Sequence, residues 1–101
     1  MALTTHTYAE QLGRSLAAHA SRECIVEELW VSTRPDGVDL WLVTQPTDMV
    51  TAGNLHGLAD ALYDAFERAD FQLFVMNPRH FRGDVHDALP RNAVQIPLRV
   101  A

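Results

Sequence analysis

The segment from Cys24 to Thr44 constrains the fold most, because a turn signal separates two runs of apolar, β-branched and aromatic residues. In Arg34-Pro35-Asp36-Gly37, proline, aspartate and glycine occupy the second, third and fourth positions of a turn. This order favours a type I turn followed by a glycine bulge, in which Gly37 supplies the positive φ. The sequence therefore predicts a β-hairpin that pairs Arg34 with Val38, Thr33 with Asp39, Val31 with Trp41 and Trp30 with Leu42. Both faces of this hairpin would carry large apolar side chains, so we expect cover on both sides.

Two amphipathic helices are predicted around the hairpin. The first runs from Tyr8 to Ser21 and has a stripe of leucines and alanines. Gly13 lies within this stripe, which indicates the close approach of another backbone. The second runs from Ala52 to Ala69, where apolar residues recur at steps of three and four, and either Thr51 or Asp48 would be its N-cap.

The rest of the chain predicts two further strands and one short helix. Phe71–Met76 is almost continuously apolar, as expected of a central strand that is covered on both faces. Asp84–Leu89 predicts one helical turn before a proline. Val94–Val100 alternates between apolar and polar residues, and Pro97 places this strand at an edge because proline cannot donate to a ladder.

The predicted fold class is α+β, a mixed four-stranded sheet with two main helices. The order is helix, strand, strand, helix, strand, short helix, strand. The crossover from Val38 to Met76 predicts two parallel strands if both lie in one sheet. A chain of 101 residues with this pattern predicts a single domain, residues 1–101.

Charge and composition exclude several classes of function. A net charge of −5 disfavours general nucleic-acid binding and binding to anionic membranes. No unbroken apolar run exceeds four residues, whereas a membrane span needs about 20, so no membrane association is expected. The single cysteine, Cys24, cannot form an internal disulfide, which fits a reducing, cytoplasmic location.

The charge is unevenly distributed along the chain. Residues 1–76 carry a net charge of −7 and residues 77–101 a net charge of +2. Arg79, Arg82 and Arg91 in the second region are candidates for binding a small anion. The alternative is a solvated surface whose arginines pair weakly with the acidic remainder of the chain.

No complete catalytic or metal-binding motif is present. The five histidines lack the spacing of a zinc-binding helix, and the glycines never fall into a phosphate-binding loop. Cys24 fits a small buried apolar residue better than a thiol nucleophile. Trp30 and Trp41 fit core packing better than a stacking platform or a self-association patch. We therefore assign no catalytic residue, no metal ligand and no cofactor.

The end of the hairpin holds the remaining candidate binding residues, Ser32, Asp36 and Asp39. Asp39 is the polar residue between Val38 and the apolar run that follows. A carboxylate at the start of a buried strand indicates either metal binding or a hydrogen bond to the turn or to Thr33.

The strands and their order also resemble a known family. Leu29-Trp30-Val31-Ser32, then Arg34-Pro35-Asp36-Gly37-Val38-Asp39-Leu40, a helix, and Phe71-Gln72-Leu73-Phe74-Val75-Met76 are similar to the minimal nucleotidyltransferase domains of the polymerase-beta-like superfamily. The resemblance implies a Gly-Ser motif ending the first strand, an Asp-x-Asp pair opening the second, and a carboxylate on the third. In that family these carboxylates hold two magnesium ions that bridge the nucleotide phosphates and the attacking group.

Most of this machinery is missing here. Val31 stands where the family has the glycine of Gly-Ser, and Gly37 where it has the first aspartate, so only Ser32 and Asp39 match. Gln72 replaces the third carboxylate and cannot supply the negative charge that a two-metal site needs. The resemblance thus implies a degenerate, inactive relative, and the alternative is an unrelated domain with the same order of elements.

These observations favour a small non-catalytic interaction or regulatory domain that self-associates, with a homodimer as the expected form. The resemblance also implies a helical protein partner, as in toxin–antitoxin pairs. The alternative is a nucleotidyltransferase-like enzyme, or a nucleotide- or anion-binding domain with an atypical site near Asp39.

Overall fold

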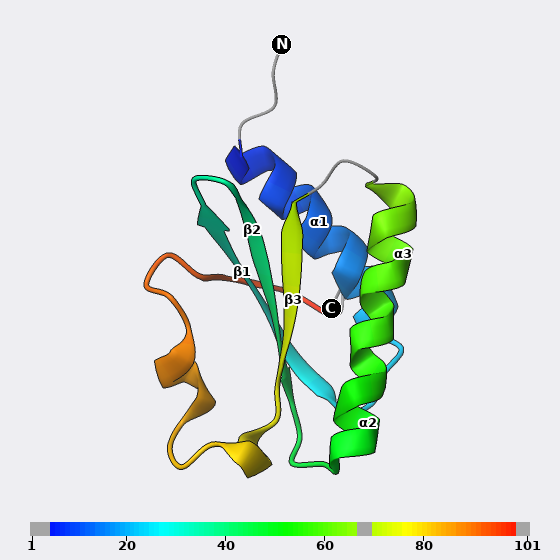
Figure 1. The fold of residues 1–101 in the computed structure, drawn as a ribbon, viewed down its shortest axis with the longest axis vertical. Coiled ribbons are helices and arrows are strands. Elements are labelled where there is room, and N and C mark those ends of the chain that lie inside the picture. Colours follow the sequence, from blue (N-terminus) through cyan, green and yellow to red (C-terminus); the bar gives the residue numbers. More distant parts are fainter. Residues whose placement is uncertain (1–4, 67–69, 99–101) are drawn as a thin grey trace.

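The computed structural model describes residues 5–66 and 70–98. The chain forms a mixed four-stranded sheet with helices on one side (Figure 1), which confirms the predicted fold class and order of elements. In chain order the elements are α1 (Thr5–Ala20), β1 (Val26–Arg34), β2 (Gly37–Thr44), α2 (Met49–Asn54), the 3₁₀ turn η1 (Leu55–Gly57), α3 (Leu58–Ala65), β3 (Phe71–Met76), the 3₁₀ turns η2 (Pro78–His80) and η3 (Val85–Ala88), and β4 (Val94–Ile96). None of the described helices has the length and apolar character that a bilayer crossing requires.

The helices differ from the prediction at their ends. α1 begins at Thr5, ahead of the predicted start. The second predicted helix begins at Met49 because Asp48 is the N-cap, where its Oδ1 accepts the Thr51 backbone N–H at 2.7 Å. This helix divides into α2 and α3 at η1, and residues 67–69 of the prediction lie outside the described residues.

The hairpin register corrects the prediction by one residue. Arg34 pairs with Gly37, so the loop contains two residues rather than three, and Trp30 lies directly opposite Trp41. Successive side chains on a strand point to opposite faces, so a shift of one residue would turn every β2 side chain to the wrong side. The observed register instead brings the buried Leu29, Val31, Leu40 and Leu42 onto one face.

Gly37 is explained by close packing and not by the turn conformation. No glycine among the described residues has a positive φ. A Cβ built on Gly37 would lie 2.6 Å from the backbone oxygen of Asp70, which accepts the Val38 N–H at 3.0 Å. A side chain at residue 37 would therefore clash with the backbone that leads into β3.

The strand order is β3-β2-β1-β4. β2 and β3 are parallel, as the crossover predicted, while β1 runs antiparallel to both β2 and β4. β4 lies at an edge, which confirms the prediction from Pro97, although it has only three residues and the predicted Val100 lies outside the described residues. The prediction of a central position for β3 was wrong, because β3 forms the opposite edge.

The sheet is covered on both faces, as the hairpin sequence predicted, but by different structures. The helix-covered face packs against α1, η1 and α3, and its core consists of apolar residues from the helices and strands: Leu12, Leu16, Leu29, Leu40, Leu42, Leu55, Leu62 and Phe71. The loop-covered face packs against residues 77–93, which contain η2 and η3. Figure 1 shows this segment on the side of the sheet away from α2 and α3. Its smaller cluster contains Val43, Met76 and Val85.

Candidate functional site

The loop-covered face is organised in rows that run across three strands. Ser32 of β1, Asp39 of β2 and Gln72 of β3 are register partners and form a polar row near the hairpin end. The next row consists of Trp30, Trp41 and Phe74, and the third of Glu28, Val43 and Met76. The positions that carry the nucleotidyltransferase resemblance thus lie side by side, with Asp39 as the carboxylate of the polar row.

Asp39 has an internal partner at the hairpin end. Its Oδ1 accepts the Arg34 Nε–H at 2.9 Å, and Arg34 Nη1 donates to Asp36 Oδ1 at 2.7 Å. The hydrogen bond to Asp39 raises the pKa of the Arg34 guanidinium, and the negative charges of Asp39 and Asp36 act in the same direction. Asp39 is only 8% exposed. The structure therefore brings Asp36 and Asp39 together around a cation of the same chain and not around an open position.

Ser32 also has a partner on this face. It is buried, and its hydroxyl oxygen accepts the Trp41 indole N–H at 3.0 Å. Trp41 in turn stacks on Phe74 with ring centroids 4.3 Å apart and an interplanar angle of 16°. Both aromatic rings are only half-buried. Cross-strand pairing thus builds a partly exposed aromatic surface that ends at the β3 edge.

The connection from β3 to β4 is held by two polar contacts that the sequence did not predict, one to the loop after β2 and one to β1. Asn77, which is buried, accepts the Thr47 N–H at 3.2 Å and donates to the Thr47 oxygen at 2.6 Å. His86 on η3 places Nε2 at 2.8 and 3.0 Å from the two Glu28 carboxylate oxygens, while its Nδ1 contacts Asp84. These contacts join residues 30 and 58 positions apart, so no local pattern could have revealed them.

Two carboxylates favour the charged form of His86. A ring with a carboxylate at each nitrogen can donate to both only when it is doubly protonated. Accordingly, the hydrogen bonds with Glu28 and then Asp84 raise the pKa of His86. Glu28 Oε1, the oxygen 2.8 Å from His86 Nε2, also accepts the Trp30 indole N–H at 2.8 Å. The cluster therefore links η3 to β1 and fixes Trp30 beside the imidazole, with ring centroids 6.1 Å apart.

The three candidate anion-binding arginines lie on the connection between β3 and β4. Arg79 belongs to η2, Arg82 follows it, and Arg91 precedes β4. All three side chains are exposed. Within the described ranges, no carboxylate lies within salt-bridge distance of any of them. The three arginines could bind an anion, and their exposure agrees equally with the alternative of a solvated surface.

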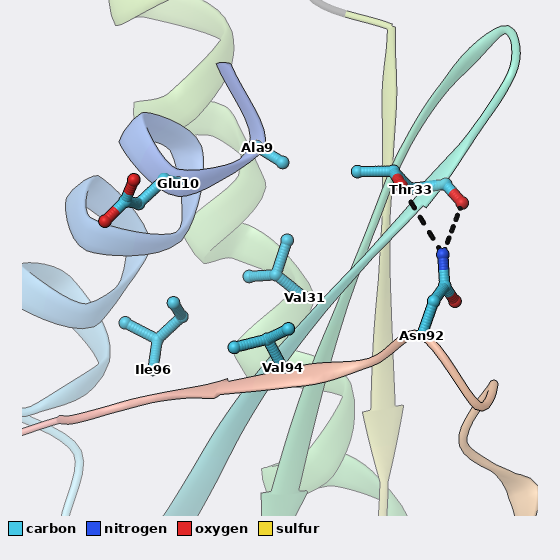
Figure 2. A pocket seen from close by; sticks show the side chains of 7 residues that line it. All are labelled: Ala9, Glu10, Val31, Thr33, Asn92, Val94 and Ile96. Carbon is cyan, nitrogen blue, oxygen red and sulfur yellow. Dashed lines mark hydrogen bonds between the residues drawn. The ribbon is translucent and has the colours of Figure 1, made fainter. Parts of the chain in front are cut away.

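A separate apolar pocket lies between α1 and β4 on the helix-covered side (Figure 2). It has a volume of about 280 Å³ and is lined mainly by Ala9, Val31, Val94 and Ile96, with Glu10, Thr33 and Asn92 as its polar members. The Asn92 side-chain N–H donates to the Thr33 backbone oxygen at 3.0 Å and closes one end. Gly13 of α1 packs next to this pocket, since a Cβ there would lie 2.8 Å from Val31 Cγ2 and 3.1 Å from Ile96 Cγ1. The close approach at Gly13 is therefore to side chains and not, as the sequence suggested, to another backbone.

Two further features bear on nucleophilic and metal chemistry. Cys24 is exposed in the turn before β1, which corrects the expectation of a buried residue. The neighbouring Arg22 and Glu23 are exposed as well, so this part of the turn faces solvent. Among residues 5–66 and 70–98, no group of three or more histidine, cysteine, aspartate or glutamate side chains could hold a metal ion.

Comparison with models of known protein families, with curated proteins and with solved structures finds no match to this chain.

Proposed function

We propose that this protein is a non-catalytic interaction module that self-associates through its open sheet. The observation that carries the proposal is the β3 edge. This six-residue strand, Phe71–Met76, contains no charged residue and no proline, and no described strand pairs with its outer side. Long uncharged edges of this kind are templates for pairing with another chain, and monomeric proteins usually protect them.

The layout of the polar row supports a role without catalysis. Two-metal phosphoryl-transfer sites hold their ions with several carboxylates. Across Ser32, Asp39 and Gln72 there is a single carboxylate, and Arg34 already neutralises it. The Arg34 guanidinium beside Asp39 opposes the binding of a cation there by charge repulsion, so the row is better suited to stabilising the hairpin.

Sedimentation equilibrium over a range from low to high micromolar protein tests self-association directly. We expect the mean mass to rise with concentration towards that of a dimer. A strict monomer throughout this range would refute the proposal.

The nucleotide-binding alternative has its own measurement. Calorimetry with magnesium and each nucleoside triphosphate should show no binding heat at millimolar ligand, because Asp39 is engaged by Arg34. Saturable heat that disappears in Asp39→Asn would instead establish a ligand site at the hairpin end. For the arginines, a rise in melting temperature with phosphate or sulfate at constant ionic strength would indicate anion binding.

A further inference from the structure

The two edges of the sheet differ in their protection. β4 has three residues and is followed at once by Pro97, and both features discourage pairing. β3 has twice that length and neither safeguard. If the protein pairs edge to edge, β3 is therefore the strand that it uses.

The β2–β3 register shows which β3 backbone groups are unpaired. Val38 pairs with Phe71, and the Val38 N–H donates to the Asp70 oxygen. In a parallel ladder, backbone groups of alternate residues point to the same neighbour. Those of Gln72 and Phe74 therefore point to β2, and those of Leu73 and Val75 point outward.

We propose that two copies of this chain pair β3 with β3 in antiparallel fashion, with Leu73 on the two-fold axis. This inference rests on the proposed function and specifies its interface. Leu73 then exchanges both backbone hydrogen bonds with Leu73 of the second copy, and Val75 pairs with Phe71. A second copy is the favoured occupant because an antiparallel edge is complementary to itself. An uncharged strand also brings no like charges together across the axis.

Side chains on both faces of β3 fit this arrangement. Phe74, half-buried against Trp41, would lie opposite Gln72 of the second copy and gain cover from it. On the helix-covered face, Phe71 stacks on Tyr63 with centroids 4.5 Å apart, and Tyr63 is 49% exposed. The pairing would join the two sheets into one of eight strands and extend the aromatic row to the partner's polar row.

Hydrogen exchange of the wild-type protein tests the interface. We expect the Leu73 and Val75 amides to exchange quickly in dilute protein and slowly in concentrated protein. The Gln72 and Phe74 amides should be slow in both, because they are paired with β2 within the chain. If sedimentation shows a dimer but Leu73 and Val75 remain unprotected, the interface is wrong while self-association stands. A strict monomer overturns both.

The substitution Val75→Pro gives an independent test. It removes the outward N–H but leaves the ladder with β2 intact, and Val75→Ala is the matched control that shortens the side chain and keeps the N–H. We expect Val75→Pro, once circular dichroism shows it folded, to weaken dimerisation about tenfold or more by removing two symmetry-related hydrogen bonds. Val75→Ala should dimerise nearly as well as wild type. Equal dimerisation of the proline variant and the alanine variant would refute the β3 interface.

Discussion

The two faces of the sheet are stabilised in different ways. The helix-covered face buries a large apolar core under regular helices, in which Leu12, Leu16, Leu40 and Leu62 have no exposed surface. The loop-covered face has a much smaller apolar cluster, whose buried members are Val43, Met76 and Val85. A long connection with two 3₁₀ turns covers it, attached by Asn77 and His86.

This difference teaches how a small chain can cover both sides of a sheet. Apolar burial scales with area, so the helix-covered face should provide most of the folding free energy. Each polar contact contributes less to the folding free energy than a buried apolar side chain does, but it requires a specific geometry. Polar contacts can therefore fix the position of a segment that has little apolar core of its own. We expect substitutions to separate global stability from attachment of the connection.

The largest expected effect comes from Leu40→Ala on the helix-covered face. This truncation leaves a cavity in a fully buried site and should lower the free energy of unfolding by about 2–5 kcal/mol. Val43→Ala, on the same strand but the opposite face, should cost about 1–2 kcal/mol for its two lost carbons. Urea denaturation measures both. A cost for Val43→Ala equal to or above that of Leu40→Ala would contradict the comparison of faces.

Asn77→Ala should have the next largest effect. It removes a buried amide that satisfies both the N–H and the oxygen of Thr47, so we expect a loss of about 1–3 kcal/mol. Asn92→Ala is the control, because Asn92 is exposed and its loss should cost well under about 1 kcal/mol. Amide exchange in residues 77–93 should increase more than in α1 for Asn77→Ala. Uniform exchange through both regions would show that Asn77 supports the whole fold instead.

Gly13→Ala tests how tightly α1 packs on the helix-covered face. The added methyl would overlap Val31 Cγ2, a stiff buried side chain, and we expect a loss of about 1–2 kcal/mol. Gly53→Ala is the matched control, because a Cβ built there would meet nothing within 4 Å beyond its chain neighbours and the backbone of its own helix. Alanine should stabilise that helical position by up to about 1 kcal/mol. Stabilisation by both substitutions would show that α1 can move away from the sheet.

The smallest expected effect is a pH dependence of the His86 contact. Because the pKa of His86 is raised from 6.5 in the folded protein, its contribution is complete below that pH and disappears as pH rises through the folded pKa. The His86 side chain is 41% exposed, so the contribution should stay below about 1 kcal/mol. Wild type should lose stability relative to His86→Gln over the range above about pH 6.5, as pH rises through the folded pKa. A constant difference over this range would exclude a charged contact.

Local patterns in the sequence were sufficient to predict the helices, the hairpin and the parallel crossover. They failed where the answer depends on a distant neighbour. The hairpin register depends on which strand residues pack against the helices. The need for glycine at position 37 comes from the backbone of Asp70, which lies too close for a side chain. The apolar character of β3 suggested a central strand, but Leu73 and Val75 pack on the helix-covered core even at an edge.

The candidate site was predicted in part for the same reason. Ser32 and Asp39 do lie together with Gln72, because strand register follows from the order of elements. The partner of Asp39 was missed: in the observed register Arg34 lies on the same face as Asp39, whereas Thr33 pairs with Val38 on the other face. The contact of His86 with Glu28 depends on how the long connection returns across the sheet, which no motif encodes.

The position of the two tryptophans gives the protein a built-in optical reporter. Trp30 and Trp41 are the only tryptophans in the chain, and both pack with the cluster on the loop-covered face. Indole emission will therefore respond to the release of the connection, while far-ultraviolet circular dichroism follows the helices on the other side. Unfolding curves from the two signals should separate if the connection detaches first, and should coincide if both faces are lost in one cooperative step.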